Sequence, residues 1–273
     1  MMMRALVVLG VVVASGLGCG DDGASTPEVV ACDPGTGGKP VGCVYGALVD
    51  DAGKPVVGAK VSACTDKECI ITNTTDAGVY NIQGLTVEAH RIDVLGEPKG
   101  VVTMIWWMPV TEGVQSRLAH PVVVHDLDRV TKVPLAPAEG GTVLLADGQL
   151  ELSAEPDTLK YPIGTVDKSI GAIEVDIDEL PPFDLTPWKG KESRSRAFIF
   201  NPFPMKSTTS AHLRVFGEER AAVNATYTVY SANYTFGHLD EVGLMRADGS
   251  GALVSESGGA LKDLTTIIIV PND

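Results

Sequence analysis

The chain has 273 residues, and its 35 acidic residues against 21 Lys and Arg give a formal net charge of −14 at neutral pH. Negative charge on this scale argues against nucleic acid, whose phosphates would be repelled, and against electrostatic attraction to anionic lipid. No nucleic-acid partner is therefore expected.

The first 18 residues are typical of an export signal. Arg4 is the only charged residue before Asp21, and an apolar run follows it over residues 5–18. This run is shorter than the roughly 20 residues that a membrane-spanning helix needs. A basic end, a short apolar segment and small residues at the boundary predict a signal peptide over residues 1–18.

Cys19 follows the apolar run directly, in the sequence Gly-Leu-Gly-Cys. This sequence resembles the bacterial lipobox, although Gly16 stands where that motif usually has leucine. The resemblance implies that Cys19 is joined by a thioether to diacylglycerol, and that the protein is a lipid-anchored lipoprotein of the cell envelope, on an outer-membrane, periplasmic or surface face. Several acyl chains, such as palmitate, anchor a protein stably where a single chain is marginal. The alternative is a secreted protein in which Cys19 is an incidental thiol.

The rest of the chain divides into a tether and two strand-rich parts. Residues 20–40 are rich in Gly, Asp and Pro, so the lipidated segment 19–40 is expected to be a flexible tether. Beyond it, short apolar runs alternate with Asp-Gly and Pro-rich turns, and no helical period is evident. This pattern predicts an all-β protein with two tandem β-sandwich domains, over residues 41–136 and 137–273.

Four further cysteines, an even number, fit disulfides in an oxidising compartment: Cys32, Cys43, Cys64 and Cys69. Three pairings are possible. Cys64 and Cys69 flank a polar four-residue loop between strand-like runs, so we expect them to face each other across a hairpin, with Cys32 bonded to Cys43. A four-thiolate zinc site is the rival interpretation, but the paired Cys-x-x-Cys spacing of such sites is lacking.

Residues 41–136 carry a recognisable signature. The stretches VYGALVDDAGKPVVGAKVSAC, TNTTDAGVYNIQGL and RVTKVPL resemble the carboxypeptidase regulatory-like domain, a small prealbumin-like β-sandwich. Gly53 is free to take a positive φ in the first turn, Pro55 is expected to lead the chain back into the sheet, and Tyr80 should point into the core. In that family the module is accessory, so the resemblance implies no peptidase activity.

Residues 137–273 repeat the strand pattern. Asp147-Gly148 and Asp248-Gly249 each lie between apolar runs and predict hairpins, and LTTIIIV is typical of a strand buried on both faces. The alternation in AIEVDID predicts a strand with one solvated face. The opening GGTV and the closing hairpin resemble the all-β module of zonula-occludens proteins, netrin receptors and ankyrins.

No catalytic apparatus, cofactor fingerprint or metal site is evident, so no enzyme activity, cofactor or metal is expected. The five histidines show no pair at metal-ligand spacing, and His212 falls on the polar face of its strand. The stretch HDLDR, residues 125–129, places carboxylates beside an imidazole; we expect a plain polar turn there, because the glycine and distal glutamate of a calcium loop do not follow.

Trp106-Trp107 is the stretch where a binding site can be argued. Neighbours on a strand face opposite ways, so one ring should enter the core and the other should not. An exposed ring could stack on a sugar or a partner protein; alternatively it packs against the neighbouring domain or the tether. The expected function is therefore a non-enzymatic, membrane-anchored interaction or spacer module. The runner-up is a carbohydrate- or ligand-binding lipoprotein with an exposed tryptophan as its contact, and aromatic residues are few for such a module, at 5% of the chain.

Overall fold

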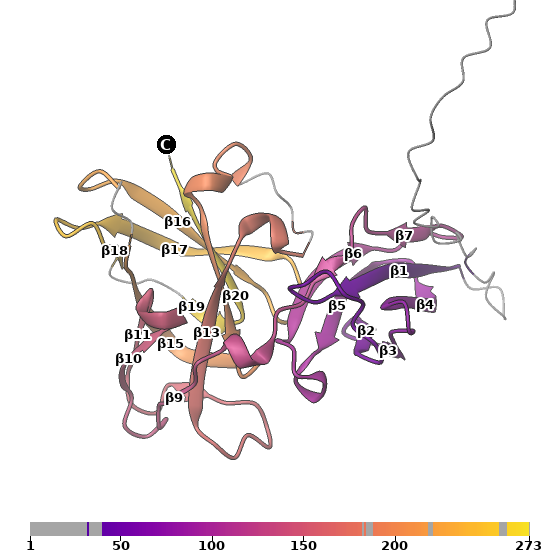
Figure 1. The fold of residues 1–273 in the computed structure, drawn as a ribbon, viewed down its shortest axis with the longest axis horizontal. Coiled ribbons are helices and arrows are strands. Elements are labelled where there is room, and N and C mark those ends of the chain that lie inside the picture. The colour runs from indigo at the N-terminus through magenta and orange to yellow at the C-terminus, as the bar shows by residue number, and fades with distance from the viewer. Residues whose placement is uncertain are drawn as a thin grey trace, which may run out of the picture. The chain divides into compact units, whose positions relative to one another are not determined.

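A computed structural model describes residues 32, 40–181, 183, 188–217, 221–256 and 261–272. The described part is built from strands and short 3₁₀ turns, as the sequence predicts for an all-β protein (Figure 1). The strands are β1 (Val41–Val49), β2 (Lys60–Cys64), β3 (Cys69–Asn73), β4 (Val79–Thr86), β5 (Ala89–Leu95), β6 (Met104–Pro109), β7 (Gln115–Arg117), β8 (Val122–Val123), β9 (Val133–Pro134), β10 (Gly141–Leu145), β11 (Leu150–Ala154), β12 (Leu159–Lys160), β13 (Ser169–Val175), β14 (Arg196–Asn201), β15 (Met205–Val215), β16 (Thr226–Ala232), β17 (Leu239–Ala247), β18 (Leu253–Ser255), β19 (Leu261–Leu264) and β20 (Thr266–Pro271). The 3₁₀ turns are η1 (Glu97–Lys99), η2 (Leu127–Arg129), η3 (Ala146–Gly148), η4 (Ile177–Glu179) and η6 (Glu192–Arg194).

The first eight strands form two four-stranded sheets. One has the order β4-β1-β7, with β8 also paired to β1, and the other has the order β3-β2-β5-β6. Strands β7 and β8 run parallel to β1, whereas the remaining pairs in these sheets are antiparallel. Apolar side chains of both sheets, among them Val44, Tyr80, Ile92 and Trp106, belong to one buried cluster.

The later strands form one large antiparallel sheet. Its order is β10-β11-β15-β18-β17-β16-β20-β14-β13-β9, and β12 and β19 pair with β15. Strand β20 lies between β16 and β14, and all six of its residues are buried, as the continuous apolar run LTTIIIV predicts. Side chains from several strands of this sheet, among them Leu150, Phe198, Leu213 and Ile267, form a second buried apolar cluster.

The two halves of the chain share core residues. The first cluster also contains Ile173 of β13, Ala197 of β14 and Ile268 of β20 from the large sheet. Strand β9, near the end of the first predicted domain, pairs with β13. The division at residues 136 and 137 stays a prediction.

The predicted turns form by the expected chemistry. Gly53 has φ +75°, and the carboxylate of Asp50 accepts hydrogen bonds from the amides of Ala52 and Lys54, at 2.9 and 2.8 Å. Both predicted hairpins are present, since Asp147-Gly148 joins β10 to β11 and Asp248-Gly249 joins β17 to β18.

Two local predictions were wrong. Pro55 makes only an isolated bridge to Val49, and the chain turns at Gly58 (φ +68°) before β2 begins at Lys60. The AIEVDID strand ends at Val175, because the residues after it form η4. In both places the apolar pattern extends beyond the residues whose backbone is paired, before β2 in one case and after β13 in the other.

Both expected disulfides are present, with Cα–Cα distances of 5.5 Å for Cys32–Cys43 and 4.0 Å for Cys64–Cys69. Cys64 and Cys69 are directly paired across the β2–β3 hairpin, and Cys32 is tied to strand β1 through Cys43. The predicted signal peptide, the lipidation site Cys19 and nearly all of the predicted tether lie outside the described residues. Within the described part, no helix is long and apolar enough to cross a membrane.

Candidate functional site

Strand β6 presents its two tryptophans to opposite faces. Trp106 is fully buried in the core, whereas 40% of Trp107 is exposed. This is the alternation that the pleat of a strand requires. In the antiparallel pairing of β6 with β5, Trp107 lies opposite Arg91. Trp106 is therefore a core residue, and Trp107 is the ring that a ligand could reach.

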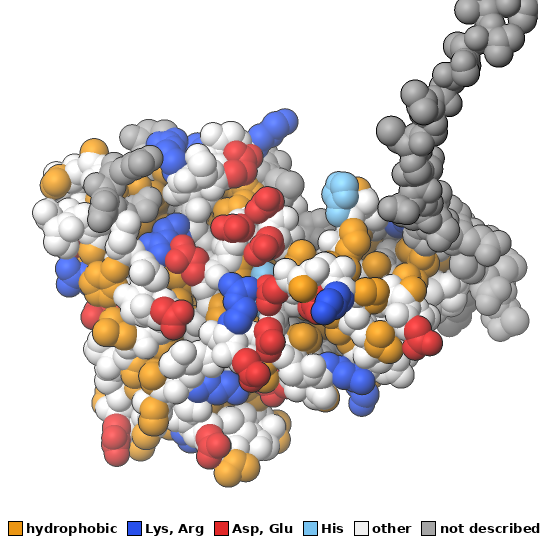
Figure 2. Space-filling model, viewed as in Figure 1, with side chains coloured by type: hydrophobic (Ala, Val, Ile, Leu, Met, Phe, Trp, Pro, Cys, Tyr) orange, Lys and Arg blue, Asp and Glu red, His pale blue; other side chains and the backbone are white. Residues whose placement is uncertain are grey.

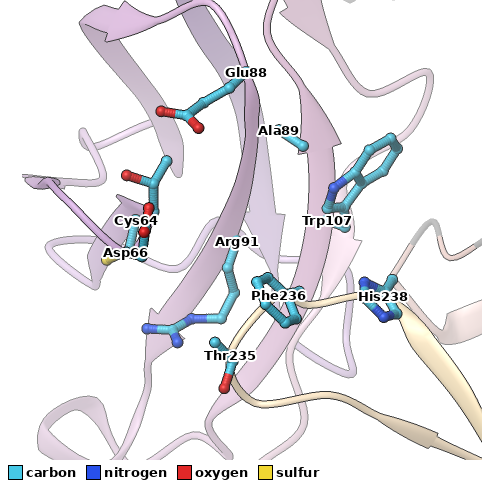
Figure 3. Close-up of a pocket in the computed structure, with 10 residues that line it drawn as sticks. Cys64, Asp66, Glu88, Ala89, Arg91, Trp107, Thr235, Phe236 and His238 are labelled. Atoms are coloured by element: carbon cyan, nitrogen blue, oxygen red, sulfur yellow. The ribbon is translucent and has the colours of Figure 1, made fainter.

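Trp107 lines a cleft of about 250 Å³ (Figure 3). The walls come from strands β5 and β6, from the β2–β3 hairpin loop that begins at Cys64, and from the segment between β16 and β17. The side chains with polar or aromatic groups that bear on its chemistry are Asp66, Glu88, Arg91, Trp107, Phe236 and His238.

Two further aromatic rings, those of Phe236 and His238, line the cleft with Trp107. Phe236, of which 54% is exposed, stacks on the imidazole of His238 with a centroid distance of 5.6 Å and an interplanar angle of 6°. Asp240 holds that imidazole, since its Oδ1 lies 2.9 Å from His238 Nε2. Exposed aromatic rings on two sides of one cleft offer flat apolar faces for a ring-shaped ligand to stack on.

Asn233 fixes the backbone that carries Phe236. Its Oδ1 accepts hydrogen bonds from the amides of Thr235 and Phe236, at 2.8 and 3.2 Å, and its Nδ2 donates to Asp240 Oδ2 at 2.7 Å. We call residues 233–238 the aromatic loop. These bonds brace the backbone of the loop, which reduces the ordering cost of binding a ligand.

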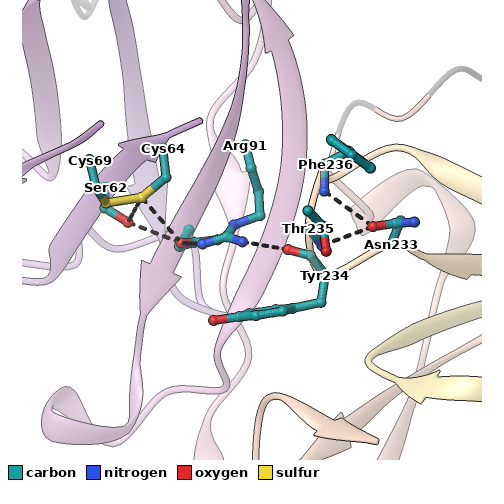
Figure 4. A network of polar contacts seen from close by, with 9 residues as sticks. Ser62, Cys64, Cys69, Arg91, Asn233, Tyr234, Thr235 and Phe236 are labelled. Carbon is teal, nitrogen blue, oxygen red and sulfur yellow. Dashed lines mark hydrogen bonds and ion pairs between the residues drawn. A yellow bond between two sulfur atoms is a disulfide. The ribbon is translucent and has the colours of Figure 1, made fainter. Parts of the chain in front are cut away.

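Arg91 joins the aromatic loop to strand β5 (Figure 4). Its guanidinium binds both carboxylate oxygens of Asp93, at 2.6 and 2.8 Å, donates to the carbonyl of Tyr234 at 2.5 Å, and lies 4.5 Å from the centre of the Tyr234 ring. Burial raises the pKa of Asp93, against the lowering effect of Arg91 and of the Ser62 hydroxyl, which donates to Asp93 Oδ2 at 3.1 Å. The positive charge of Arg91 is thus committed to Asp93 and Tyr234 and is not free for a ligand.

Carboxylates dominate the opposite wall. Glu88 is half-buried, with its Oε1 3.0 Å from the Thr86 hydroxyl oxygen, and Asp66 is exposed on the β2–β3 loop. The ion pairs of the described residues around the cleft are His90–Glu68, Arg91–Asp93 and His238–Asp240, so neither Glu88 nor Asp66 is neutralised by a cation there. The cleft therefore combines aromatic faces with uncompensated negative charge.

His90 lies beneath this wall and is fully buried. Its Nδ1 lies 3.1 Å from the carbonyl of Glu88 and its Nε2 lies 3.4 Å from Glu68 Oε1. Hydrogen bonds from Thr86 lower the pKa of Glu68 in spite of its partial burial, with His90 as a smaller contribution. The arrangement fixes the β4–β5 turn that carries Glu88.

The HDLDR stretch is only in part the polar turn that was predicted. Asp126 caps η2 by accepting the amide of Asp128 at 2.9 Å, which is a plain turn, but His125 is fully buried. Its Nδ1 lies 2.7 Å from Asp51 Oδ1, which Arg129 also contacts at 2.6 Å. Sequence reasoning missed this cluster, because Asp51 is 74 residues away and nothing near His125 points to it.

The other histidines give no metal centre in the described part of the chain, where no three His, Cys, Asp or Glu side chains are grouped to hold an ion. His212 is exposed on β15, on the polar face that was expected.

Comparisons with known proteins assign no family. No protein-family profile and no curated protein matches the chain. Among solved structures, the Bacillus anthracis TIE protein aligns with 84% of this chain at 13% identity and a TM-score of 0.29. A Bacteroides uniformis protein proposed to bind carbohydrate aligns with 85% at 7% identity and 0.26, over 80% of its own length. A DUF3823 family protein from Parabacteroides merdae aligns with 86% at 7% identity and 0.27, over its whole length.

The chain spans about half, 48%, of the Bacillus anthracis protein. At such low identities and TM-scores these likenesses carry no argument about ligand or activity. The resemblances to the carboxypeptidase regulatory-like domain and to the zonula-occludens-type module stay predictions.

Proposed function

We propose that this chain is a non-enzymatic binding protein of the cell envelope, anchored by lipid at Cys19, and that the cleft at Trp107 binds carbohydrate. The single observation that supports carbohydrate over a simple spacer is the exposure of Trp107, at 40%, in the same cleft as the exposed Phe236. An exposed ring on β6 was the feature expected to separate these two functions.

Aromatic surface that is exposed to water can gain free energy by binding a ligand. A Trp or Phe ring contributes 150–250 Å² of largely apolar area, so leaving two of them partly in water forgoes stabilisation that a ligand can restore. The flat C–H faces of a sugar ring match aromatic faces, while its hydroxyls can donate to carboxylates such as Glu88. Arg91 and Asn233 hold the aromatic loop in place, which reduces the ordering cost of binding.

The anchoring part of the proposal rests on sequence. The basic start, the short apolar run and the lipobox-like Gly-Leu-Gly-Cys support export and acylation at Cys19. The non-enzymatic part also rests on sequence, which contains no recognised nucleophile motif, phosphate loop or metal-ligand spacing.

Glycan-array screening of the full-length chain, followed by calorimetry with the best oligosaccharides, tests the proposal. Trp107→Ala should abolish or strongly weaken binding, and Trp107→Phe should retain most of it, since a flat ring remains. Ile163→Ala is the matched control, because Ile163 is a fully exposed apolar side chain that lies outside the cleft. Binding that is unaffected by Trp107→Ala, or no glycan binding at all, would overturn the proposal and favour an interaction or spacer module.

A further inference from the structure

The charges around the cleft restrict which sugars it can accept. Asp66 and Glu88 line it without a pairing cation among the described residues, and the guanidinium of Arg91 is occupied by Asp93 and Tyr234. His238, the other basic lining residue, is paired with Asp240. Both basic side chains of the lining, Arg91 and His238, are therefore paired with a carboxylate, whereas the two acidic side chains are paired with no cation in the described part of the chain.

A third carboxylate, that of Glu68, lies close to Glu88 outside the lining. The Thr86 hydroxyl is within 2.7 Å of Glu68 Oε1 and 3.0 Å of Glu88 Oε1, and Glu68 is itself paired with His90. One hydroxyl hydrogen can serve only one of these two oxygens at a time. Lys67, on the same loop as Asp66, is exposed and is not part of the lining.

The charge of the whole chain acts in the same direction. Its formal charge is −14, and acidic side chains gather in a band on the face shown in Figure 2. An anionic glycan approaching such a surface is repelled, while a cationic one is attracted and guided toward it.

Resting on the proposed carbohydrate function, we propose that the preferred ligand is a sugar bearing protonated amino groups, an amino sugar whose nitrogen is not acetylated. The sugar ring stacks between Trp107 and Phe236, and its ammonium group is bound by Glu88 and Asp66. Neutral sugars can use only the aromatic contacts and hydroxyl hydrogen bonds. Sugars that carry carboxylates or sulfates meet like charge.

Calorimetry on the full-length chain, in a detergent without a sugar headgroup and at mildly acidic pH and low salt, provides the test. The probes are hexamers of glucosamine, of N-acetylglucosamine, of glucose in β-1,4 linkage and of galacturonic acid. Exposed ion pairs suggest a few-fold effect for each carboxylate, so the glucosamine hexamer should bind about tenfold tighter than its acetylated form. The preference should decline as salt is raised.

Variants separate the charge contacts from the stacking. The double variant Glu88→Gln with Asp66→Asn should lower glucosamine binding to the level of the acetylated hexamer and leave the latter unchanged. Glu112→Gln is the control, since Glu112 is an exposed carboxylate outside the cleft, and it should keep the preference. Trp107→Ala should reduce binding of every hexamer that the unmodified chain binds.

The outcomes keep the two proposals apart. Equal affinity for acetylated and free amino sugars, tighter binding of the galacturonic acid hexamer, or a preference that survives the double variant would each overturn the amino-sugar proposal. In those cases binding that still depends on Trp107 leaves the carbohydrate function in place. Absence of binding to all four probes, together with an empty glycan array, would overturn both.

Discussion

At the scale of single residues, Trp106 and Trp107 are adjacent in the sequence but differ in burial, and we expect them to differ in role. The buried ring of Trp106 fills the first core, so its removal leaves a cavity, whereas Trp107 borders solvent and the cleft. Stability and binding should therefore depend on different members of the pair.

Trp106→Ala should lower the free energy of unfolding by about 3–5 kcal/mol, while Trp107→Ala, which removes a ring that is 40% exposed, should lower it by only about 1–2 kcal/mol. Urea unfolding followed by circular dichroism measures both. A loss of stability in the Trp107 variant as large as that in the Trp106 variant would mean that this ring serves packing, and would contradict its role as a ligand contact.

Asp51 gives a residue-scale prediction about pH. Burial raises the pKa of Asp51, but hydrogen bonds from the Asp126 amide and from His125, together with the charge of Arg129, outweigh it and place the pKa below the usual 3.8. A lowered pKa in the folded state contributes stability above the unfolded value, and this contribution is lost as pH falls through the folded value. Asp51→Asn should therefore destabilise the chain at neutral pH by about 1–3 kcal/mol, since it removes bonds to charged and buried groups.

Unfolding curves of Asp51→Asn and of the unmodified chain should converge as the pH is lowered below 3.8. Asp76→Asn is the control, because Asp76 is an exposed turn carboxylate. A stability difference that does not change with pH would show that the interaction of Asp51 with His125 and Arg129 does not depend on its charge.

At the scale of elements, the sequence was enough to predict strands and tight turns. It was not enough to predict contacts between segments that are far apart in the chain. The Asp-Gly hairpins, the buried run of β20 and the cross-strand Cys64–Cys69 pair follow from local residue types and spacing. The aromatic loop contacts Arg91 from 143 residues away, and Phe236 and His238 carry no local signal of a site. Half of the candidate site, the Trp107 side, was thus visible in sequence, and the half contributed by long-range packing was not.

The Arg91 bridge between β5 and the aromatic loop can be tested by substitution. Arg91→Met leaves the carboxylate of Asp93 buried without its cation, which costs about 3–5 kcal/mol of stability. Amide hydrogen exchange in residues 233–238 should accelerate more than in strands β16 and β17 on either side. Arg117→Met, which removes an arginine that lies 5.2 Å from the Tyr45 ring, is the control and should leave the exchange of the loop unchanged.

Adding Asp93→Asn to Arg91→Met should recover part of the lost stability, because no charge is then left buried and unpaired. Loop exchange should stay fast in the double variant, since the bond to the Tyr234 carbonyl is still missing. Slow exchange in either variant would show that Asn233 alone holds the aromatic loop.

At the scale of the whole molecule, three kinds of contact connect residues 41–136 to the rest of the described chain. The first kind is apolar, since side chains from both parts form one buried cluster. The second is the backbone pairing of β9 with β13. The third is side-chain hydrogen bonding, in which Asn201 Nδ2 donates to Glu97 Oε1 at 2.8 Å and Arg91 donates to the carbonyl of Tyr234. Buried apolar contact of this kind is worth roughly 25 cal/mol for each Å² removed from water, whereas the peptide link near Ala136 to Glu139 is an exposed turn.

A protease site inserted between Ala138 and Glu139 should therefore be cut readily, because the turn is exposed. The two pieces should nevertheless elute together in size-exclusion chromatography with light scattering, at the mass of the uncut chain, and separate only when denaturant is added. The shared cluster continues to bury the same side chains after the cut, so the cleft between Trp107 and Phe236 should keep its affinity for ligand. Pieces that elute separately and stay folded in buffer would instead establish two independent domains, in which the shared apolar residues contribute little to holding the parts together.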